Sequence, residues 1–300
     1  MFDRSPHHIA AGVAVERHAP ETVFALLGDD IRVGILSALG ETPDEAVPFA
    51  ELHRRVGVRD SGQFNYHLGK LRDSFVRRTD DGYELTHAGR QIVGAMYAGT
   101  FTADAAVEAV PVPDPCPVCA GSLVAEYGDE VGRIRCADCV EFRNEFGFPP
   151  GSLDQFDRED LPYAFDRWMR HVLGGVVAGF CHLCAGRIDS RLVLDDPAER
   201  VASLPGHVEY ECGRCGSSAR IGPHGPALFH PAVAGFLFDH GHDVRTDPSW
   251  TVGTRHLPAT TVRSADPPEL AVTFTGGDET LTTVLGPDGT VTAVERTPAD

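Results

Sequence analysis

The chain has 300 residues, with 44 acidic and 26 basic side chains that give a formal net charge of −18 at pH 7. An apolar content of 42% is too high for a wholly disordered chain, and the average negative charge argues against a generic surface for polyanions. Any contact with nucleic acid must therefore be local.

Lysine is almost absent from this acidic chain, since Lys70 is its one lysine. The composition resembles that of the cytosolic proteins of salt-accumulating halophilic archaea. A GC-rich genome would also replace lysine by arginine, but it would not require such an excess of acidic residues. We therefore expect a halophilic, archaeal protein.

Two features of the sequence bear on its location. The first residues contain no cationic segment followed by an apolar one, so we expect no secretory signal. The longest nearly apolar stretch, from Val172 to Phe180, is too short to span a bilayer, so we expect no membrane contact. The expected location is the cytoplasm, where thiols stay reduced.

Three short helices are predicted in the first part of the chain, over residues 20–28, 31–39 and 48–57. Each apolar pattern ends at or just before a glycine, which is a common helix stop. Asp29 or Asp30 provides an N-cap for the second helix, because a short acidic side chain can accept hydrogen bonds from its first turn.

The next helix is predicted from residue 60 to about residue 75, and Asp60-Ser-Gly-Gln63 at its start is an acidic variant of a capping box. Its apolar residues recur at helical spacing and cluster on one face, namely Phe64, Leu68, Leu71 and Phe75. The other face is polar, with Gln63, Tyr66, Lys70 and Asp73 flanked by Asn65, His67 and Arg72.

A β-hairpin is predicted over residues 76–86, since Asp81-Gly82 is a strong tight-turn dipeptide between two strand-like segments. Thr86 then caps a helix that runs to about residue 98. Residues 46–79 hold seven basic and three acidic side chains, whereas residues 101–300 hold 15 basic and 30 acidic ones. The basic excess therefore lies on the polar helix and the hairpin, where phosphate contacts would be needed.

Together these helices and the hairpin resemble a winged helix-turn-helix, and the likeness is to the arsenic-repressor-like (ArsR-type) regulators of halophilic archaea. It covers about residues 18–100 and is carried by Phe49-Ala-Glu-Leu52, Gln63-Phe-Asn-Tyr-His-Leu-Gly-Lys-Leu71 and Tyr83-Glu-Leu-Thr-His-Ala-Gly-Arg90. The resemblance implies sequence-specific binding of double-stranded DNA, regulation of transcription and a homodimer. Pairing could use Ile92, Ala95 and Met96, or the apolar stripe within residues 160–180.

The resemblance also implies that the helix over residues 60–75 enters the major groove and that the hairpin contacts the backbone or the minor groove. Gln63, near the helix N-terminus, can bond adenine bidentately, and Asn65 could do so from a flanking position. The predicted DNA contacts are Ser61, Gln63, Asn65, Tyr66, His67 and Lys70 on the helix, with Arg77 and Arg78 on the hairpin. An alternative is a zinc-ribbon adaptor that binds protein or RNA, with the winged helix as a docking module.

All eight cysteines fall into four Cys-x-x-Cys pairs. Sixteen residues separate the first two pairs and 27 separate the last two, so proximity groups the pairs two by two. Two such pairs complete a tetrahedron around one ion, and we expect two structural zinc sites per chain. The expected ligands are Cys116, Cys119, Cys136 and Cys139 at one site and Cys181, Cys184, Cys212 and Cys215 at the other.

The two cysteine units look like an internal repeat and resemble two zinc ribbons. One begins Cys-Pro-Val-Cys-Ala-Gly and the other Cys-His-Leu-Cys-Ala-Gly. Disulfides and a redox-active pair are the alternatives, which a reducing cytoplasm and the lack of a thioredoxin-like context disfavour. Metal sensing is also disfavoured, because sensing thiols of ArsR-type proteins lie in or near the DNA motif and residues 1–115 contain no cysteine.

No enzymatic activity is expected. The sequence has no glycine-rich phosphate loop, no Gly-x-Ser-x-Gly elbow and no His-Glu-x-x-His motif. A site closed by four thiolates also leaves no position for a substrate water.

The expected fold is α+β and multidomain, with a C-terminal antiparallel β-meander over residues 269–275, 280–285 and 290–294. An apolar helical stripe within residues 160–180 is either buried between the cysteine units or a dimer or effector surface. The expected divisions are a winged helix-turn-helix at 18–105, a stiff proline-rich linker at 106–115, zinc-ribbon-like units at 116–143 and 181–225, a helical connector at 144–180 between them, and a helix plus the meander at 226–300.

Overall fold

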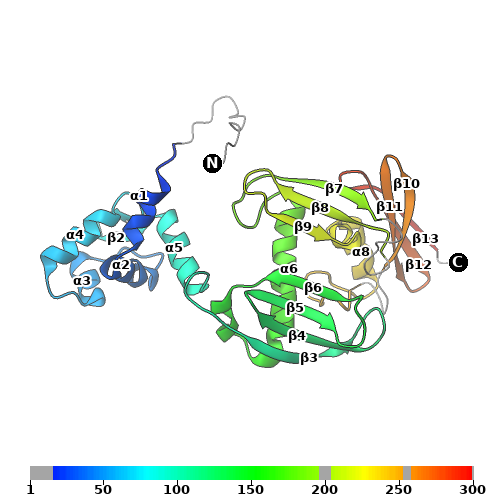
Figure 1. Cartoon of the computed structure of the whole chain (residues 1–300), viewed down its shortest axis with the longest axis horizontal. Coiled ribbons are helices and arrows are strands. Elements are labelled where there is room, and N and C mark those ends of the chain that lie inside the picture. The colour runs from blue at the N-terminus through cyan, green and yellow to red at the C-terminus, as the bar shows by residue number, and fades with distance from the viewer. Residues whose placement is uncertain (1–15, 196–203, 253–257, 299–300) are drawn as a thin grey trace. The chain divides into compact units, whose positions relative to one another are not determined.

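The computed structural model of the chain describes residues 16–195, 204–252 and 258–298. The chain divides into two compact units, residues 1–102 and residues 103–300. Both combine helices with antiparallel strands, so the expected α+β class is confirmed (Figure 1). No helix in the described ranges is long and apolar enough to cross a bilayer.

The first unit has the predicted order of helices followed by a hairpin and a further helix. The helices are α1 (Pro20–Phe24), which continues into the 3-10 turn η1 (Ala25–Leu27), α2 (Asp30–Gly40), α3 (Phe49–Val56), α4 (Ser61–Leu71) and α5 (His87–Tyr97). The hairpin consists of β1 (Val76–Arg78) and β2 (Tyr83–Leu85). The helix predicted to reach about residue 75 ends at Leu71, because Arg72 has an extended backbone and Asp73 a left-handed one, with φ of 71°.

Short polar side chains start α2 and α4, as the sequence predicted. Asp29 accepts the N–H of Arg32 at 3.1 Å and caps α2. Asp60 accepts two N–H groups of the first turn of α4, the shorter from Gly62 at 2.7 Å. Such caps satisfy backbone groups that a helix end leaves unpaired, and they place the start of α4 at a defined residue.

The apolar face of α4 forms part of the core of the first unit. Phe64, Leu68, Leu71 and Phe75 are each no more than 3% exposed, as their spacing predicted. The hairpin is fixed to this core because Tyr83 exchanges two backbone hydrogen bonds with Val47, at 2.8 and 2.9 Å. The polar face of α4 and strand β1 are therefore held on one rigid unit.

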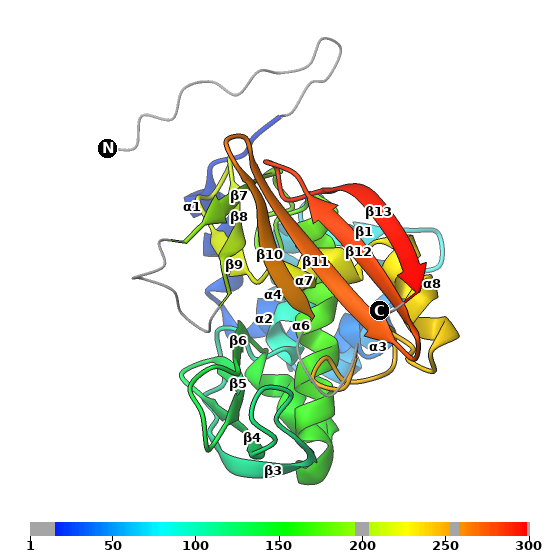
Figure 2. The same cartoon turned by 90° about the vertical axis from the view of Figure 1, so that its right-hand side faces the viewer.

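Within its described residues, the second unit contains three antiparallel sheets with their strands in sequence order. The first sheet has β3 (Val107–Pro115), β4 (Ser122–Gly128), β5 (Val131–Cys136) and β6 (Arg143–Gly147), and the second has β7 (Ile188–Leu194), β8 (Gly206–Cys212) and β9 (Ser218–Ile221). The third, seen face-on in Figure 2, has β10 (Ala259–Ala265), β11 (Pro268–Gly276), β12 (Glu279–Leu285) and β13 (Val291–Pro298). The helical elements are η2 (Pro150–Gln155), η3 (Arg158–Asp160), α6 (Leu161–Val177), α7 (His224–Leu228) and α8 (Pro231–Asp239).

The prediction of a linker at residues 106–115 is wrong, because this segment is strand β3 and pairs with β4. Val110 and Val112 are 5% and 6% exposed and anchor the strand in the core. Proline lacks an N–H for the ladder, but β3 is an edge strand, where prolines are tolerated. The prolines therefore mark a sheet edge rather than an unpaired linker.

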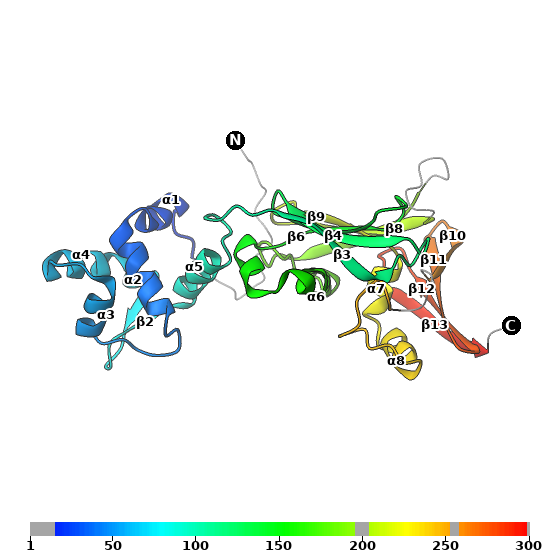
Figure 3. The same cartoon turned by 90° about the horizontal axis from the view of Figure 1, so that it is seen from below.

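The predicted helical connector at residues 144–180 is only partly helical. Its first residues complete strand β6, and α6 begins at Leu161 after two 3-10 turns. Phe165 belongs to the core beneath β3–β6, whereas Val176 belongs to the core shared by β7–β9 and the C-terminal sheet. Figure 3 shows α6 lying below the strands of the first two sheets, and the rest of its apolar stripe, at Trp168, Met169, Val172, Leu173 and Val177, is half-buried.

The C-terminal meander has one strand more than the sequence predicted. Strands β11, β12 and β13 lie at the predicted positions, and β10 precedes them and pairs with β11. None of the seven residues of β10 is buried, so its sequence lacks the alternation of apolar and polar residues that identifies a strand.

Candidate functional site

The eight cysteines lie in the two clusters that their spacing predicted, and all are free thiols. We call the group of Cys116, Cys119, Cys136 and Cys139 cluster 1, and the group of Cys181, Cys184, Cys212 and Cys215 cluster 2. Within each cluster the four sulfur atoms lie within 4.8 Å of one another. The disulfide alternative is therefore excluded in this structure.

The sulfur geometry fits a tetrahedral ion. The closest sulfur pairs, Cys119–Cys136 and Cys184–Cys212, are each 3.5 Å apart, and Cys116–Cys139 is 3.9 Å apart. A Zn²⁺ ion with Zn–S bonds of about 2.3 Å at tetrahedral angles places its sulfur ligands about 3.8 Å apart. Each cluster can therefore hold one metal ion such as zinc, with all four positions filled by protein ligands.

The first turn of each cluster has the same backbone. Ala120 and Ala185 directly follow the second cysteine of their turns and have left-handed φ values of 59° and 51°. Their N–H groups donate to the carbonyl oxygens of Cys116 and Cys181, at 2.9 and 2.8 Å. The internal repeat seen in the sequence is thus repeated in backbone geometry.

Backbone N–H groups point at the sulfur atoms of the second turns. The N–H of Asp138 donates to the sulfur of Cys136 at 3.3 Å, and the N–H of Arg214 donates to that of Cys212 at 3.4 Å. Hydrogen bonding from the N–H of Cys215 lowers the pKa of Cys212 to about 6. Such bonds favour the thiolate, which is the form that binds metal.

A second candidate site is the polar face of α4. Five predicted contacts on this helix are exposed, namely Ser61, Gln63, Asn65, Tyr66 and Lys70. The Lys70 ammonium lies 5.4 Å from the centre of the Tyr66 ring, and this ring is 59% exposed. These side chains offer hydrogen-bond donors and acceptors, one cation and one aromatic ring on one helix.

His67 does not belong to the exposed face on which the sequence prediction placed it. Its side chain is only 12% exposed, and its Nδ1 lies 3.0 Å from a carboxylate oxygen of Asp29, the N-cap of α2. His67 is one helical turn from the buried Phe64, which brings its ring toward the core side of α4. The structure therefore gives His67 an internal contact.

The two hairpin arginines differ in their partners. Arg77 faces Glu84 across the hairpin, and its Nε donates to a carboxylate oxygen at 2.6 Å. Arg78 is exposed and has no ion pair within the described residues. The prediction treated both as equivalent, because a sequence does not show which carboxylate a strand will face.

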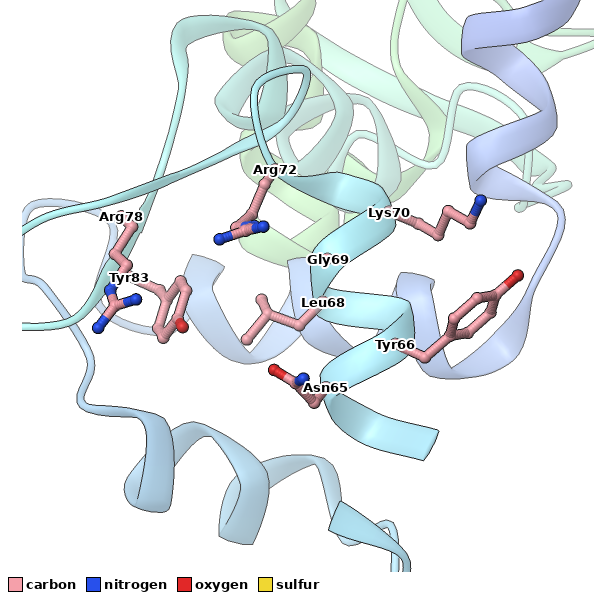
Figure 4. Close-up of a pocket in the computed structure, with 8 residues that line it drawn as sticks. All are labelled: Asn65, Tyr66, Leu68, Gly69, Lys70, Arg72, Arg78 and Tyr83. Carbon is pink, nitrogen blue, oxygen red and sulfur yellow. The ribbon is translucent and has the colours of Figure 1, made fainter. Parts of the chain in front are cut away.

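Arg78 lies at a groove between α4 and β1, with a volume of about 460 Å³. The lining residues are Asn65, Tyr66, Leu68, Gly69, Lys70, Arg72, Arg78 and Tyr83, so three cations and no carboxylate line the groove. Figure 4 shows Asn65, Arg72 and Arg78 directed into the space between helix and strand, while Tyr66 and Lys70 extend on the other side of α4.

Arg72 is the functional candidate that sequence reasoning missed. It follows the last residue of α4, is exposed and has no ion pair within the described ranges. Its extended backbone carries it from the helix toward Arg78. In the sequence, only the position of Arg72 in the basic segment at residues 46–79 indicated a possible role. The direction of its side chain depends on where α4 ends.

Comparison with known proteins identifies two family models. Residues 20–96 match a domain of unknown function (DUF7347), and residues 113–291 match a domain of unknown function (DUF7351). No curated protein and no solved structure matches the chain. Because the second match spans more than half of the sequence and includes both cysteine clusters, the chain belongs to the DUF7351 family.

Proposed function

We propose that the chain binds double-stranded DNA in a sequence-specific manner and regulates transcription. In this proposal the first unit is an ArsR-type winged helix-turn-helix, with α4 as its recognition helix and β1–β2 as its wing. The observation that carries the proposal is the groove between α4 and β1, into which Arg72 and Arg78 point and which no carboxylate lines.

The charge distribution supports a local nucleic-acid interface. The chain carries a net charge of −18, whereas the side chains that line the groove include no carboxylate. Arg72 and Arg78 have no ion pair in the described part of the chain, and neither does Lys70. Cations that are not neutralised by carboxylates can exchange counterions with DNA phosphates, which is the main source of backbone affinity.

The first turns of α4 carry side chains that can recognise a DNA base sequence. Gln63 and Asn65 are exposed on the first turns of the helix, and Ser61 precedes them. Recognition helices contact base edges mostly through their N-terminal residues, and Gln or Asn can form a bidentate pair with adenine. The proposed division is base reading at this end and phosphate binding at Arg72 and Arg78.

Exposed aromatic side chains support a homodimer in this proposal. Phe24 on α1, Tyr97 at the end of α5 and Phe101 after it are 64%, 62% and 85% exposed. Ile92, Ala95 and Met96, which the sequence suggested for pairing, are half-buried. The proposed dimer contact is therefore these aromatic residues, and two copies would contact half-sites about one helical turn apart.

The test is a mobility-shift titration of the full chain with DNA from upstream of its own coding sequence, in molar KCl. Specific retention that is lost in the Tyr66→Ala/Lys70→Ala variant is the expected result. A variant on the buried face of α4 is not a useful control. The control is Arg54→Ala, because Arg54 is exposed and already paired with Glu51. Absence of retention, with a protein or RNA recovered in a pull-down, would instead support the adaptor alternative.

A further inference from the structure

The two cysteine clusters carry opposite charges at the same position of their second turn. Asp138 lies between Cys136 and Cys139 in cluster 1, and Arg214 lies between Cys212 and Cys215 in cluster 2. The clusters share their ligand set and the backbone of their first turn. Comparing cluster 1 with cluster 2 therefore shows how a neighbouring charge affects a metal site.

Both side chains reach from the second turn of their cluster to the first. The Asp138 carboxylate accepts the N–H of Ser122 at 2.7 Å and lies against Gly121, where an added Cβ would have to displace it. The Arg214 guanidinium donates to the carbonyl of Cys184 at 3.4 Å, and its Cβ lies against Gly186, the counterpart of Gly121. Each charge is therefore held beside the sulfur ligands.

These charges have opposite effects on a bound ion. A Zn²⁺ ion bound by four thiolates forms a Zn(Cys)4 centre with a charge of about −2. The carboxylate of Asp138 repels this developing negative charge, whereas the guanidinium of Arg214 attracts it. The Arg187–Asp189 ion pair near cluster 2 adds no net charge.

The sulfur ligands of cluster 1 are also more accessible to solvent than those of cluster 2. Cys119 is exposed, whereas every cysteine of cluster 2 is buried or half-buried. A competing ligand must approach the ion as a thiolate leaves it, so an exposed sulfur offers the first point of exchange. The neighbouring charge and the exposure of the ligands are independent observations. Both indicate that cluster 1 binds its ion less tightly than cluster 2.

We propose that cluster 1 is an exchangeable site for Zn²⁺ or another thiolate-binding divalent ion, while cluster 2 retains its ion permanently. The proposal goes beyond the structural zinc expected for both clusters. It concerns the second unit alone and does not depend on whether the first unit binds DNA.

The direct test follows which thiols are released first. The zinc-loaded full chain is mixed with the chromogenic chelator 4-(2-pyridylazo)resorcinol, and freed thiols are alkylated with iodoacetamide and located by peptide mass mapping. We expect two phases, about tenfold or more apart, which is the scale on which outer partners change metal affinity. The early label should fall on the cysteines of cluster 1; early label on cluster 2, equal rates or an unloaded cluster 1 would overturn the proposal.

Two variants that each remove one charge test the role of charge. Asp138→Asn keeps an acceptor for the Ser122 N–H and should slow the early phase severalfold, while Arg214→Gln should accelerate release from cluster 2. Asp129→Asn is the matched control, because Asp129 is an exposed acidic residue at the opposite end of β4. If Asp138→Asn behaves like Asp129→Asn, the argument from charge is overturned, and the proposal then depends on the exposure of Cys119 and on the measured order of release.

Discussion

Arg77 and Glu84 face each other across the β1–β2 hairpin, and the Arg77 Nε lies 2.6 Å from a carboxylate oxygen of Glu84. The next residue, Arg78, points to the other side of the strand, at the groove beside α4, and has no such partner within the described residues. Adjacent strand residues point to opposite faces, so two neighbouring arginines have different electrostatic surroundings. This difference decides which of them is available to a phosphate.

Glu84→Gln is expected to strengthen DNA binding. The change removes a carboxylate that both neutralises Arg77 and repels phosphates, so Arg77 becomes available for a backbone contact. The slope of log K against log salt should become steeper by about one, as for one added phosphate contact. The measurement is a mobility-shift titration over a series of KCl concentrations, and an unchanged slope would mean that Arg77 does not face the DNA backbone.

Arg78→Gln and Arg72→Gln are each expected to weaken DNA binding about equally for all sequences. Both remove a groove cation without a competing carboxylate, so each should reduce the salt slope by about one. Arg77→Gln is the matched control on the same strand, and its effect should be smaller because Glu84 already neutralises Arg77. A larger effect at Arg77 than at Arg78 would contradict the assignment of the groove to phosphate, even if the wild-type chain binds DNA.

Gln63→Ala is expected to change base preference at one position of the target. Gln63 is exposed near the start of α4, and losing one bidentate contact costs about 1–3 kcal/mol at the base pair concerned. Affinity for unrelated DNA should stay the same, because no cation is removed. Binding to a randomised DNA library measures both quantities, and an unaltered base preference would show that another residue of α4 reads that base.

Features set by neighbouring residues could be predicted from the sequence. The caps at Asp29 and Asp60, the apolar face of α4 and the grouping of the cysteines depend on spacings of a few residues or on proximity along the chain. The hairpin itself is of the same kind, although its turn lies over Asp80 and Asp81, between Thr79 and Gly82, rather than at Asp81-Gly82. In each case a local rule of backbone hydrogen bonding or side-chain spacing determines the structure.

Features set by partners distant in the sequence could not be predicted. Strand β3 exists because Val112 packs in a core that also contains residues of β4, β5 and α6, and its prolines hid that pattern. The groove depends on where α4 ends and on the strand register that pairs Arg78 with Tyr83. Neither the helix end nor the register follows from composition or periodicity.

Asp166→Ala is expected to destabilise the second unit. Asp166 is 1% exposed, lies 2.8 Å from the Arg170 guanidinium and accepts the N–H of Ser249 at 3.1 Å. Burial raises the pKa of Asp166, and the nearby Arg170 opposes this effect. Removing one partner of a buried ion pair costs about 3–5 kcal/mol, because the remaining charge stays buried without compensation.

Tryptophan fluorescence during denaturant unfolding measures this change selectively. The chain has two tryptophans, Trp168 and Trp250, and both lie in the second unit. The Asp166→Ala/Arg170→Met variant should recover part of the lost stability, since it leaves no unpaired charge. An equally unstable double variant would show that packing or the Ser249 contact, rather than the ion pair, accounts for the loss.

Metal content is expected to be two zinc ions per chain, and complete removal of metal is expected to unfold the sheets around the clusters. Cys116, Cys136 and Cys212 are at most 5% exposed, so their sulfur atoms are enclosed with the apolar core rather than attached to its surface. Without an ion, the metal–sulfur bonds of each cluster are lost and only weak contacts between its four thiols remain. The free energy of metal binding then no longer contributes to folding.

Elemental mass spectrometry of the purified chain measures the metal content, and far fewer than two zinc ions per chain would contradict the assignment of both clusters. Tryptophan fluorescence should then show that metal-free chain unfolds at lower denaturant than loaded chain. Because Trp168 packs against the core that includes Cys116 and Cys136, and Trp250 belongs to that core, this signal reports mainly the first sheet. Loss of the cluster 1 ion alone should therefore produce most of the fluorescence change. If the fluorescence changes only when the ion of cluster 2 is also removed, the metal-dependent stability lies in cluster 2.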